Sequence, residues 1–335
     1  MDEKLKFGII GCGSIAQIVH IPILNRLNSV EIKAICDIDK KKVQQIANRY
    51  NIKNYYTDVE KFLSENEFDA VMILTPTNTH KEITELTSNY CKNIFVEKPL
   101  ARNSQEAKEL CASLKKQNAN IMVGLNMRFR PDAMLLKSVV ESGGLGFPYF
   151  ARVGWFRPRS SMQSWFVKKN ISGGGAVLDL GLNILDLAMW FFDYPQIHSI
   201  TATNFYHTTK EVEDASVVMI KTKKGQVVAS EMSWILNNEN EFFYCNLHGK
   251  EGTGLLNPFR IFKSTGINQI DIPLSKKSQS YTFYFKSYEN ELKHFISSIK
   301  GYTKWVSTCE EAISRLELIG LIYKSAKLNK EIILK

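Results

Sequence analysis

The sequence lacks the residue patterns that mark metal sites. Its 335 residues include six histidines and six cysteines, but no His-x-His, His-Glu-x-x-His or Cys-x-x-Cys occurs. We therefore expect no bound metal. The cysteines lie among apolar residues, which favours free buried thiols over disulfides or a zinc site. They are Cys12, Cys36, Cys91, Cys111, Cys245 and Cys309.

Long hydrophobic runs are also missing. No apolar run approaches the roughly 18 residues that a membrane-spanning helix needs. The chain starts with charged residues, and the apolar run after them stops at Gly11, which is too short for the core of a signal peptide. These absences predict a cytoplasmic protein with no membrane partner.

The net charge of +9 is not gathered into a basic stripe. Lysines occur in short groups at 40–42, 223–224 and 276–277, without interleaved aromatic residues. We interpret them as a solvated surface and expect no nucleic-acid partner. The same charge is compatible with a mild attraction for anionic small ligands such as a nucleotide or a sugar nucleotide.

The first part of the chain alternates strand-like and helical patterns. Strands are expected at 5–10, 30–36, 55–56, 70–74, 94–96 and 121–123. Helices are expected from the first glycine-rich turn to about 27, and at 59–63, 79–90 and 104–116, the third with Asn78 or Thr79 as its N-cap. This alternation predicts an α/β domain with a parallel, doubly wound sheet at residues 1–123.

After Gly124 the pattern changes to strands joined by short turns. Strands are expected at 150–156, 197–206, 215–221, 226–234 and 242–248, and helices up to 141 and at 288–299 and 310–328. The alternation of Tyr281, Phe283 and Phe285 indicates strand core or a subunit contact. Residues 124–335 are therefore interpreted as a second α/β domain with a large, mostly antiparallel sheet.

A glycine-rich turn follows the first strand. Gly11-Cys12-Gly13-Ser14-Ile15-Ala16 has the Gly-x-Gly-x-x-Ala spacing that lets a pyrophosphate approach a helix N-terminus. The next strand ends at Asp37, whose carboxylate can accept hydrogen bonds from ribose hydroxyls and would repel a 2′-phosphate. NAD is therefore expected in preference to NADP, although Lys40 to Lys42 lie close enough to soften the repulsion.

Two further strands end in polar residues. Thr75-Pro76-Thr77-Asn78-Thr79-His80 follows one, and Glu97-Lys98-Pro99 follows the other. Ligands of parallel sheets bind outside the carboxyl ends of the strands, so a cofactor and a substrate could meet there. Pro99 restricts Lys98 to an extended backbone. The alternatives are a surface Glu-Lys-Pro turn and a His80 that simply faces water.

A polar stripe lies on an otherwise apolar helix after Gly173-Gly174-Gly175. Asp179, Asn183 and Asp186 fall within about 60° of one another on one helical face. Unpaired burial of such groups costs several kcal/mol, so they need partners. A ligand site is favoured; the alternative is that they satisfy the glycine-rich loop. Further pocket candidates, which could equally be ordinary packing residues, are Asn126, Arg128, Trp155 and Trp165.

In this order and spacing, the motifs resemble the Gfo/Idh/MocA family of NAD(P)-dependent oxidoreductases over nearly the whole chain. The resemblance implies an N-terminal Rossmann domain and a C-terminal α/β domain whose open sheet often mediates homodimers or homotetramers. It also implies a sugar, cyclitol or sugar-nucleotide substrate, with Lys98 as the catalytic residue. One position departs from the family: Asn183 stands where a histidine or tyrosine is usual, and an amide cannot exchange a proton at neutral pH.

These residues lead to one mechanistic hypothesis and one rival. Hydride transfer from a secondary alcohol requires removal of the hydroxyl proton, and ketone reduction requires its supply. We expect Lys98 to contact the reacting oxygen, Asp179 to orient Lys98 or a neighbouring hydroxyl, and Asn183 only to position the substrate. Ketone reduction is expected to be favoured over oxidation. The rival is a non-catalytic sensor that binds NAD and a sugar, which Asn183 favours.

Overall fold

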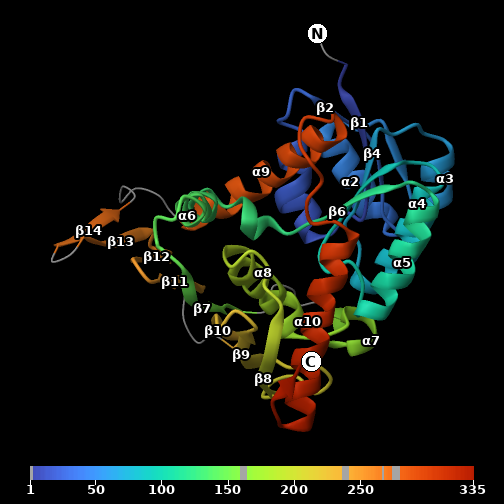
Figure 1. The fold of residues 1–335 in the computed structure, drawn as a ribbon. Helices are drawn as coiled ribbons and strands as arrows, with labels where there is room; N and C mark the ends of the chain where they lie inside the picture. The colour runs from blue at the N-terminus through green and yellow to red at the C-terminus, as the bar shows by residue number, and fades with distance from the viewer. Residues whose placement is uncertain (1–2, 159–163, 236–240, 266–267, 274–279) are drawn as a thin grey trace. The chain divides into compact units, whose positions relative to one another are not determined.

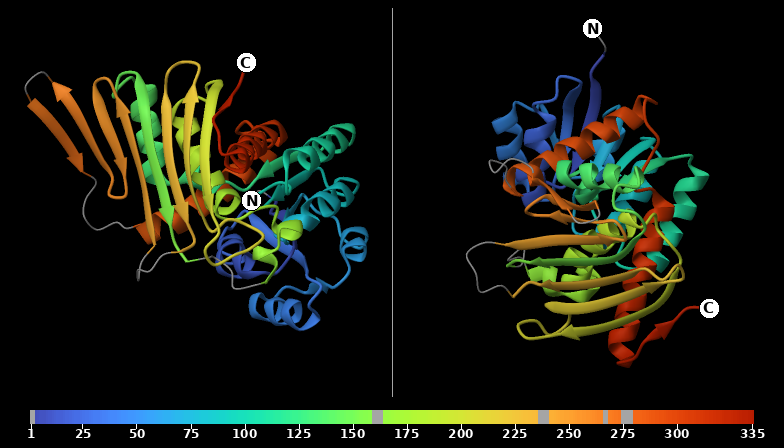
Figure 2. Two further views of the ribbon diagram at one scale, coloured as in Figure 1. Left: turned by 90° about the horizontal axis from the view of Figure 1, so that it is seen from below. Right: turned by 60° about the vertical axis from the view of Figure 1, so that its left-hand side comes forward.

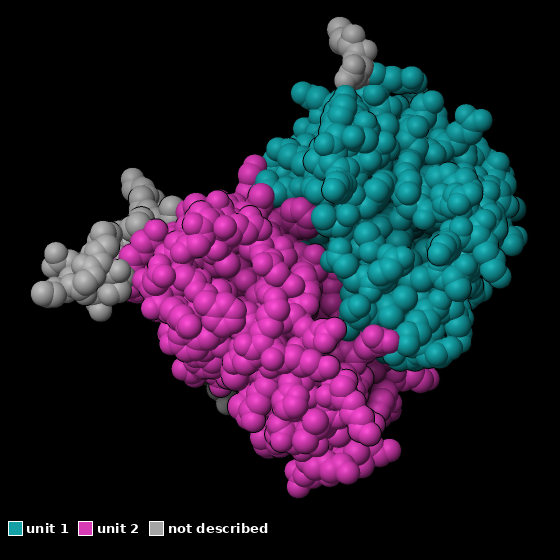
Figure 3. All heavy atoms as spheres, in the orientation of Figure 1, with its two compact units in different colours: residues 1–125, 288–314 teal, residues 126–287, 315–335 magenta. Residues whose placement is uncertain are grey.

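The chain forms two compact units. The computed structural model describes residues 3–158, 164–235, 241–265, 268–273 and 280–335 (Figure 1). Unit 1 comprises Met1–Leu125 and Tyr288–Ser314, and unit 2 comprises Asn126–Ser287 and Arg315–Lys335 (Figure 3). The two continuous segments expected from the sequence differ from these units, because residues 288–314 belong with the N-terminal part.

Unit 1 is built on a six-stranded parallel sheet in the order β3-β2-β1-β4-β5-β6. The expected parallel, doubly wound architecture is confirmed. The strand order reverses at β1 and β4, which is where Rossmann sheets open a crevice for a ligand. The strands are β1 (Leu5–Ile10), β2 (Val30–Cys36), β3 (Asn54–Tyr56), β4 (Ala70–Ile73), β5 (Asn93–Val96) and β6 (Asn120–Val123).

Short polar caps start three of the helices in unit 1. Asp39, Asp58 and Asn103 each accept a hydrogen bond from a backbone N–H three residues later, as expected for N-caps. These helices are α2 (Lys40–Tyr50), α3 (Val59–Ser64) and α5 (Ser104–Lys116). The first helix consists of a π-helical turn, η1 (Ala16–His20), and α1 (Ile21–Leu24), so it ends before the expected residue 27.

Helix α4 (Thr77–Ser88) starts earlier than expected. Its N-cap is Pro76, and not Asn78 or Thr79. The Thr79 hydroxyl instead donates to the Pro76 carbonyl oxygen at 2.8 Å, which satisfies it within the first turn. Proline suits this boundary because it lacks the N–H that an interior helical residue would have to pair.

The second segment of unit 1 is held by apolar packing. In helix α9 (Ser280–Ile299), the Phe295 ring packs edge-on against the rings of Phe7, at 5.9 Å, and Phe95, at 5.5 Å. The Glu291 carboxylate accepts a hydrogen bond from the N–H of Leu125. These contacts explain why residues 288–314 belong to unit 1 although they follow more than a hundred residues of unit 2.

Unit 2 contains a nine-stranded sheet among its described residues, in the order β14-β13-β12-β11-β7-β10-β9-β8-β15 (Figure 2). Only the pairing of β7 with β10 is parallel in the described sheet, so the expected mostly antiparallel sheet is confirmed. The strands are β7 (Pro148–Phe156), β8 (Ile197–Phe205), β9 (Ala215–Thr222), β10 (Val227–Ser233), β11 (Phe242–Gly249), β12 (Gly252–Leu256), β13 (Arg260–Thr265), β14 (Asn268–Pro273) and β15 (Ile332–Ile333).

Helices cover one face of this sheet. Helices α6 and α8 lie against it, and residues along β9 alternate between buried and exposed (Figure 2). The opposite face therefore presents exposed side chains such as Val217 and Met219. The helical elements are η2 (Asn126–Phe129), α6 (Pro131–Glu141), η3 (Ser164–Val167), α7 (Lys169–Ser172), η4 (Val177–Gly181), α8 (Leu182–Phe191) and α10 (Cys309–Leu328), which belongs to unit 2 from Arg315 onward.

One helical stretch in the described residues is long and apolar enough to cross a membrane. Lys169–Phe191 has a mean hydropathy of 1.3 over its best 18-residue window, 94% of which is buried inside the protein. The expectation from the sequence concerned uninterrupted apolar runs, and this stretch is interrupted by Asp179, Asn183 and Asp186. The mean hydropathy is high because apolar residues surround the three polar side chains. A helix that is apolar on nearly all sides is expected in a protein core, and the burial of this stretch agrees with that.

The aromatic residues at 281, 283 and 285 are helical, so the expected strand was wrong. They lie in the first turns of α9, which continues into the buried residues Leu292, Phe295 and Ile296. That later spacing follows the helical period. Three alternating aromatics are too short a pattern to separate a strand from a helix.

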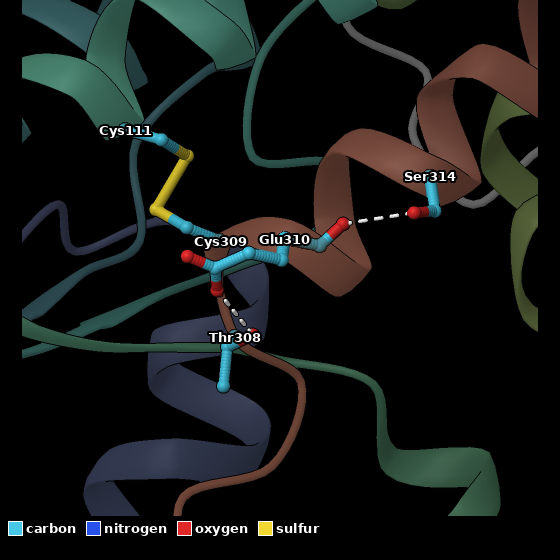
Figure 4. Close-up of a disulfide and its surroundings, with 5 residues drawn as sticks. All are labelled: Cys111, Thr308, Cys309, Glu310 and Ser314. Atoms are coloured by element: carbon cyan, nitrogen blue, oxygen red, sulfur yellow. Dashed lines mark hydrogen bonds between the residues drawn. A yellow bond between two sulfur atoms is a disulfide. The ribbon is translucent and has the colours of Figure 1, made fainter.

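Two cysteines are paired, in contrast to the expectation of free thiols throughout. Cys111 of α5 forms a disulfide with Cys309 at the start of α10, and their Cα atoms are 5.7 Å apart (Figure 4). The two residues are 198 positions apart in sequence, so spacing alone could not indicate the pair. The remaining cysteines are free and buried, as expected: Cys12, Cys36, Cys91 and Cys245.

Candidate active site

The glycine-rich loop has the backbone geometry that its sequence predicts. Gly11 has a φ of +95°, and a Cβ there would lie 2.7 Å from the backbone of Leu74. Only glycine fits that position without strain. At Gly13, by contrast, a Cβ would meet no described atom within 4 Å. The protein leaves open space beside Gly13, which fits the close approach of a pyrophosphate that we expect for Gly11 through Ala16.

Asp37 is tied to this loop. Its Oδ2 accepts the N–H of Cys12 at 2.8 Å, and its Oδ1 accepts the N–H of Asp39 at 2.9 Å. Lys42 donates to the same Oδ1 at 3.2 Å. Among the three lysines considered from the sequence, Lys42 is thus the one that contacts Asp37. Burial, reinforced by the Asp37 charge, raises the pKa of the Cys12 thiol to about 12, so this cysteine stays neutral.

His80 is buried between two strand-end loops. Its Nδ1 lies 2.8 Å from the carbonyl oxygen of Pro99, and its Nε2 lies 2.8 Å from that of Thr75. Burial lowers its pKa, against the opposing effect of these two backbone contacts. The alternative that His80 faces water was therefore wrong. It links the Thr75 loop to the Glu97-Lys98-Pro99 segment, while Pro76 and Asn78 stay exposed.

Glu97 is also buried, which rules out a plain surface turn. One carboxylate oxygen lies 2.7 Å from Nε2 of His20, and the other accepts the backbone N–H of Lys98 at 3.0 Å. Burial by itself raises the pKa of Glu97, but the hydrogen bond and charge of His20, together with Lys98, outweigh it, and the pKa is lowered. An ionised carboxylate thus binds the backbone N–H of Lys98.

In unit 2, Asp179 of η4 receives two donors that the sequence reasoning did not assign to it. The indole N–H of Trp234 donates to Oδ2 at 3.0 Å, and Arg157 lies 3.5 Å from the same oxygen. The guanidinium of Arg157 lies over the ring of Trp155 at 4.6 Å. The ring of Trp165 packs against Phe166, which in turn contacts Trp234. Asp179 therefore belongs to an aromatic-rich cluster.

The polar stripe divides into different environments. Asn183 donates from Nδ2 to the backbone oxygen of Asp179 at 3.1 Å, whereas its buried Oδ1 has no partner in the described parts of the chain. Asp186 instead makes two hydrogen bonds of 2.6 Å with Arg128 and an ion pair with Arg315 at 2.9 Å. The hydroxyl of Tyr194 also donates to it at 3.0 Å.

Glu213, and not a residue of the polar stripe, accepts hydrogen bonds from backbone N–H groups in and just after the glycine-rich loop of unit 2. Glu213 accepts the backbone N–H groups of Gly175 at 3.0 Å and Val177 at 2.9 Å. A Cβ at Gly175 would lie only 1.9 Å from the Glu213 carbonyl oxygen, so the close approach requires glycine. The alternative in which the stripe caps this loop was therefore wrong. Sequence reasoning missed Glu213 because it lies on a distant connection between strands.

The remaining pocket candidates have protein partners or packing roles. Asn126 donates to the Ser287 hydroxyl at 2.8 Å, and Arg128 is the partner of Asp186 described above. Trp155 is buried, and its indole N–H finds no acceptor within the described ranges. Within those ranges, no group of three or more His, Cys, Asp or Glu side chains could hold a metal ion.

The fold and these loops define a protein of the dinucleotide-binding, two-domain class. Residues 5–125 match the model of an oxidoreductase family with an NAD-binding Rossmann fold, and residues 134–254 match the C-terminal domain of the same family. The chain belongs to the Gfo/Idh/MocA oxidoreductase family, and its Rossmann unit is of the NAD-binding type.

Individual relatives are distant but match most of the chain. D-glucoside 3-dehydrogenase of Escherichia coli is 24% identical, over 97% of this chain and 96% of its own length. Myo-inositol 2-dehydrogenase of Thermotoga maritima is 24% identical, over 89% of each chain. A solved levoglucosan dehydrogenase in complex with NADH and levoglucosan has a TM-score of 0.89 at 20% identity, with 99% of both chains covered.

Proposed function

We propose that this protein transfers a hydride between nicotinamide and a secondary alcohol or ketone of a sugar, cyclitol or sugar derivative, with Lys98 as the main acid/base. The observation that carries the proposal is the placement of three loops. Neighbouring strands β1, β4 and β5 are parallel, so the Gly11 loop, the Thr75 loop and Lys98 follow the same ends of adjacent strands. Parallel sheets bind cofactors at those ends.

The cofactor would be held by residues already described. The loop Gly11 through Ala16 would receive the pyrophosphate, Asp37 the adenosine ribose, and Thr75, Pro76, Asn78, His80 and Glu97 would border the nicotinamide ribose. Bound NAD supplies the hydride acceptor, and NADH the donor. Lys98 would hold or release the proton of the reacting oxygen at its Nζ.

Unit 2 would supply substrate-binding groups. Asp179, held by Trp234 and Arg157, would orient the reacting hydroxyl. The buried Oδ1 of Asn183 and the buried N–H of Trp155 are an acceptor and a donor, each without a partner in the described residues. A polyhydroxylated substrate provides both complementary groups, because each hydroxyl donates and accepts. The names of the relatives, which act on glucoside, inositol and levoglucosan, support the same substrate class.

Ketone reduction would suit this site better than alcohol oxidation. A protonated lysine is ready to donate a proton, whereas Asn183 cannot take up the hydroxyl proton that a histidine at its position could accept during oxidation. We expect the reduction rate with NADH to exceed the oxidation rate with NAD at neutral pH for one substrate pair. A faster oxidation under the same conditions would contradict this preference.

The test is a substrate panel. Purified protein is mixed with NADH or NADPH and with keto-sugars, inosose and sugar nucleotides, and nicotinamide absorbance and cofactor affinity are followed together. Turnover is expected for wild type and for Lys116→Met, a control lysine on α5. Lys98→Met should lose about 10²–10⁴-fold in kcat, which is the usual worth of a general acid/base. Full turnover of Lys98→Met would refute the mechanism.

A non-catalytic sensor that binds NAD and a sugar is the second candidate, favoured by Asn183. Tight cofactor binding without turnover over the whole panel would support it. The variant Asn183→His separates the two functions, because it restores the proton-exchanging side chain usual in the family. If wild type is inactive and Asn183→His is active on the same substrate, the native protein is better described as a sensor.

We also propose a homodimer or homotetramer formed through the open face of the unit 2 sheet. Apolar side chains are exposed on strands β8, β9 and β11 of that sheet: Phe205, Val217, Met219 and Phe242. Single exposed apolar residues are ordinary, but several on one face indicate a contact surface. Light scattering of wild type and of Val217→Asp would test this: the variant should dissociate, and a monomeric wild type would refute the proposal.

A further inference from the structure

In unit 1, the side chains of His20 and Glu97 form a buried polar cluster that contacts the backbone of Lys98. His20 of η1 is fully buried, and its Nε2 contacts Glu97 at 2.7 Å. The imidazole lies edge-on to the rings of Phe95, at 5.6 Å, and Tyr288, at 5.7 Å. These two rings fix the plane of the imidazole, so its Nε2 stays directed at the carboxylate.

The contact defines the direction of the hydrogen bond. An ionised carboxylate can only accept, so Nε2 of His20 must carry the proton. The other oxygen of Glu97 accepts the backbone N–H of Lys98 at 3.0 Å. The carboxylate therefore joins a buried helix residue to the backbone of the lysine.

Gly124 leaves room for this arrangement. A Cβ at Gly124 would lie 2.9 Å from the Phe95 ring and 3.4 Å from the carboxyl carbon of Glu97. A side chain at residue 124 would displace the Phe95 ring, which packs against the imidazole of His20. The cluster is thus supported from β5, from η1 and from the residue that follows β6.

We propose that His20 is a positioning residue that acts through Glu97 on Lys98. The inference rests on the proposed function, because it assigns a role in the chemistry of Lys98. His20 binds one oxygen of Glu97 and so directs the other to the Lys98 backbone, which holds the lysine in its working orientation.

The charges around Glu97 come from several elements. The titratable groups that interact electrostatically with it are His20, His80 of α4, Lys98 and Glu291 of α9. Burial, followed by the charge of Glu97, raises the pKa of Glu291 well above its usual value. Glu97 is the carboxylate that accepts the Lys98 backbone N–H, so its removal acts on Lys98 directly.

The test compares wild type with His20→Gln, His20→Leu and Glu97→Gln in the NADH-dependent reduction. His20→Gln retains an N–H near the position of Nε2 and should keep kcat within about threefold. His20→Leu should lower kcat by about 30-fold or more, with the NADH Kd changed by less than about threefold. Glu97→Gln keeps the shape but loses the charged acceptor of the His20 N–H, so kcat should fall by about tenfold.

The outcomes separate a positioning role from a structural one. If His20→Leu fails to fold, Glu97→Gln still tests the proposal through its kcat. Unchanged kcat in the folded variants would overturn the inference while leaving the proposed function in place. A wild type without turnover on any substrate would overturn both, and a His20→Gln protein as impaired as His20→Leu would overturn the role given to the Nε2 proton.

Discussion

Two buried carboxylates, Glu97 in unit 1 and Asp186 in unit 2, are handled differently. Asp186 is surrounded by two arginines and a tyrosine hydroxyl, with Arg128 bound through both of its oxygens. Glu97 contacts one histidine side chain and accepts one backbone N–H. Burial opposes ionisation at both, and the neighbouring positive groups lower the pKa of both.

The difference lies in what each carboxylate holds. Asp186 joins separate segments of unit 2, because its partners are Arg128, Arg315 and Tyr194. Its loss would leave two buried guanidinium groups without this carboxylate partner. Glu97 holds the backbone of the residue beside it, which is Lys98. The first arrangement is typical of a structural ion pair, and the second of a group that positions a catalytic residue.

The largest expected effect comes from removing Asp186. Asp186→Ala should lower the free energy of unfolding by about 3–5 kcal/mol, because breaking a buried ion pair from one side leaves uncompensated charge. Denaturant melts measure it. Glu141→Ala, whose carboxylate is exposed beside Lys137, is the control and should change stability by less than about 1 kcal/mol. A loss below about 1 kcal/mol for Asp186→Ala would contradict the structural role of Asp186.

Much of unit 1 was predictable because its signals are local. The Gly11 loop, Asp37 and Glu97-Lys98-Pro99 each follow a buried strand, and the rule for parallel sheets places them at one edge. The pairing of His20 with Glu97 was not predictable in this way. It joins residues 77 positions apart, and an isolated histidine in an apolar helix gives no indication of its partner.

The polar stripe of unit 2 shows where helical periodicity stops being informative. The helical wheel correctly placed Asp179, Asn183 and Asp186 in a buried helix, but the partners of Asp186 come from residues 128, 194 and 315. The same limit hid Glu213 and the Cys111–Cys309 disulfide. Side-chain partners far apart in sequence depend on tertiary packing, which no local pattern encodes.

The next largest effect concerns the disulfide, which ties the second segment of unit 1 to α5. Cys309→Ser should lower the free energy of unfolding by about 3–5 kcal/mol, because the closed loop is long and the bond restricts the unfolded chain. Non-reducing and reducing melts of wild type measure the same quantity. Cys91→Ser, at a free buried cysteine, is the control for loss of a thiol. If reduction leaves the wild-type melt unchanged, the bond does not contribute the expected stability.

Glu291 gives a smaller effect that depends on pH. Its pKa is raised in the folded state, so the unfolded chain ionises first, and stability should fall as pH rises from about 4.3, the unfolded value, toward the folded pKa. Glu291→Gln removes this cost and should gain about 1 kcal/mol at pH 8 and little at pH 4. Thermal melts at both pH values measure the gain. Glu289→Gln, on the same helix, is the control, and a gain at pH 4 equal to that at pH 8 would contradict the assignment.

The smallest expected effect concerns the contact between Lys42 and Asp37. It tests whether the charge of Lys42 weakens the repulsion between Asp37 and a 2′-phosphate. Lys42 donates to Asp37, and Lys41, one position earlier on α2, is exposed. With Lys42 removed, the Asp37 charge repels a 2′-phosphate more strongly, so Lys42→Ala should raise the ratio of the NADPH Kd to the NADH Kd by about 5- to 10-fold. That ratio corresponds to about 1 kcal/mol, is measurable by fluorescence titration, and should weaken with added salt. Lys41→Ala should leave the ratio within about twofold; an equal change in both variants would mean that general surface charge, and not the Lys42–Asp37 contact, tunes the choice of cofactor.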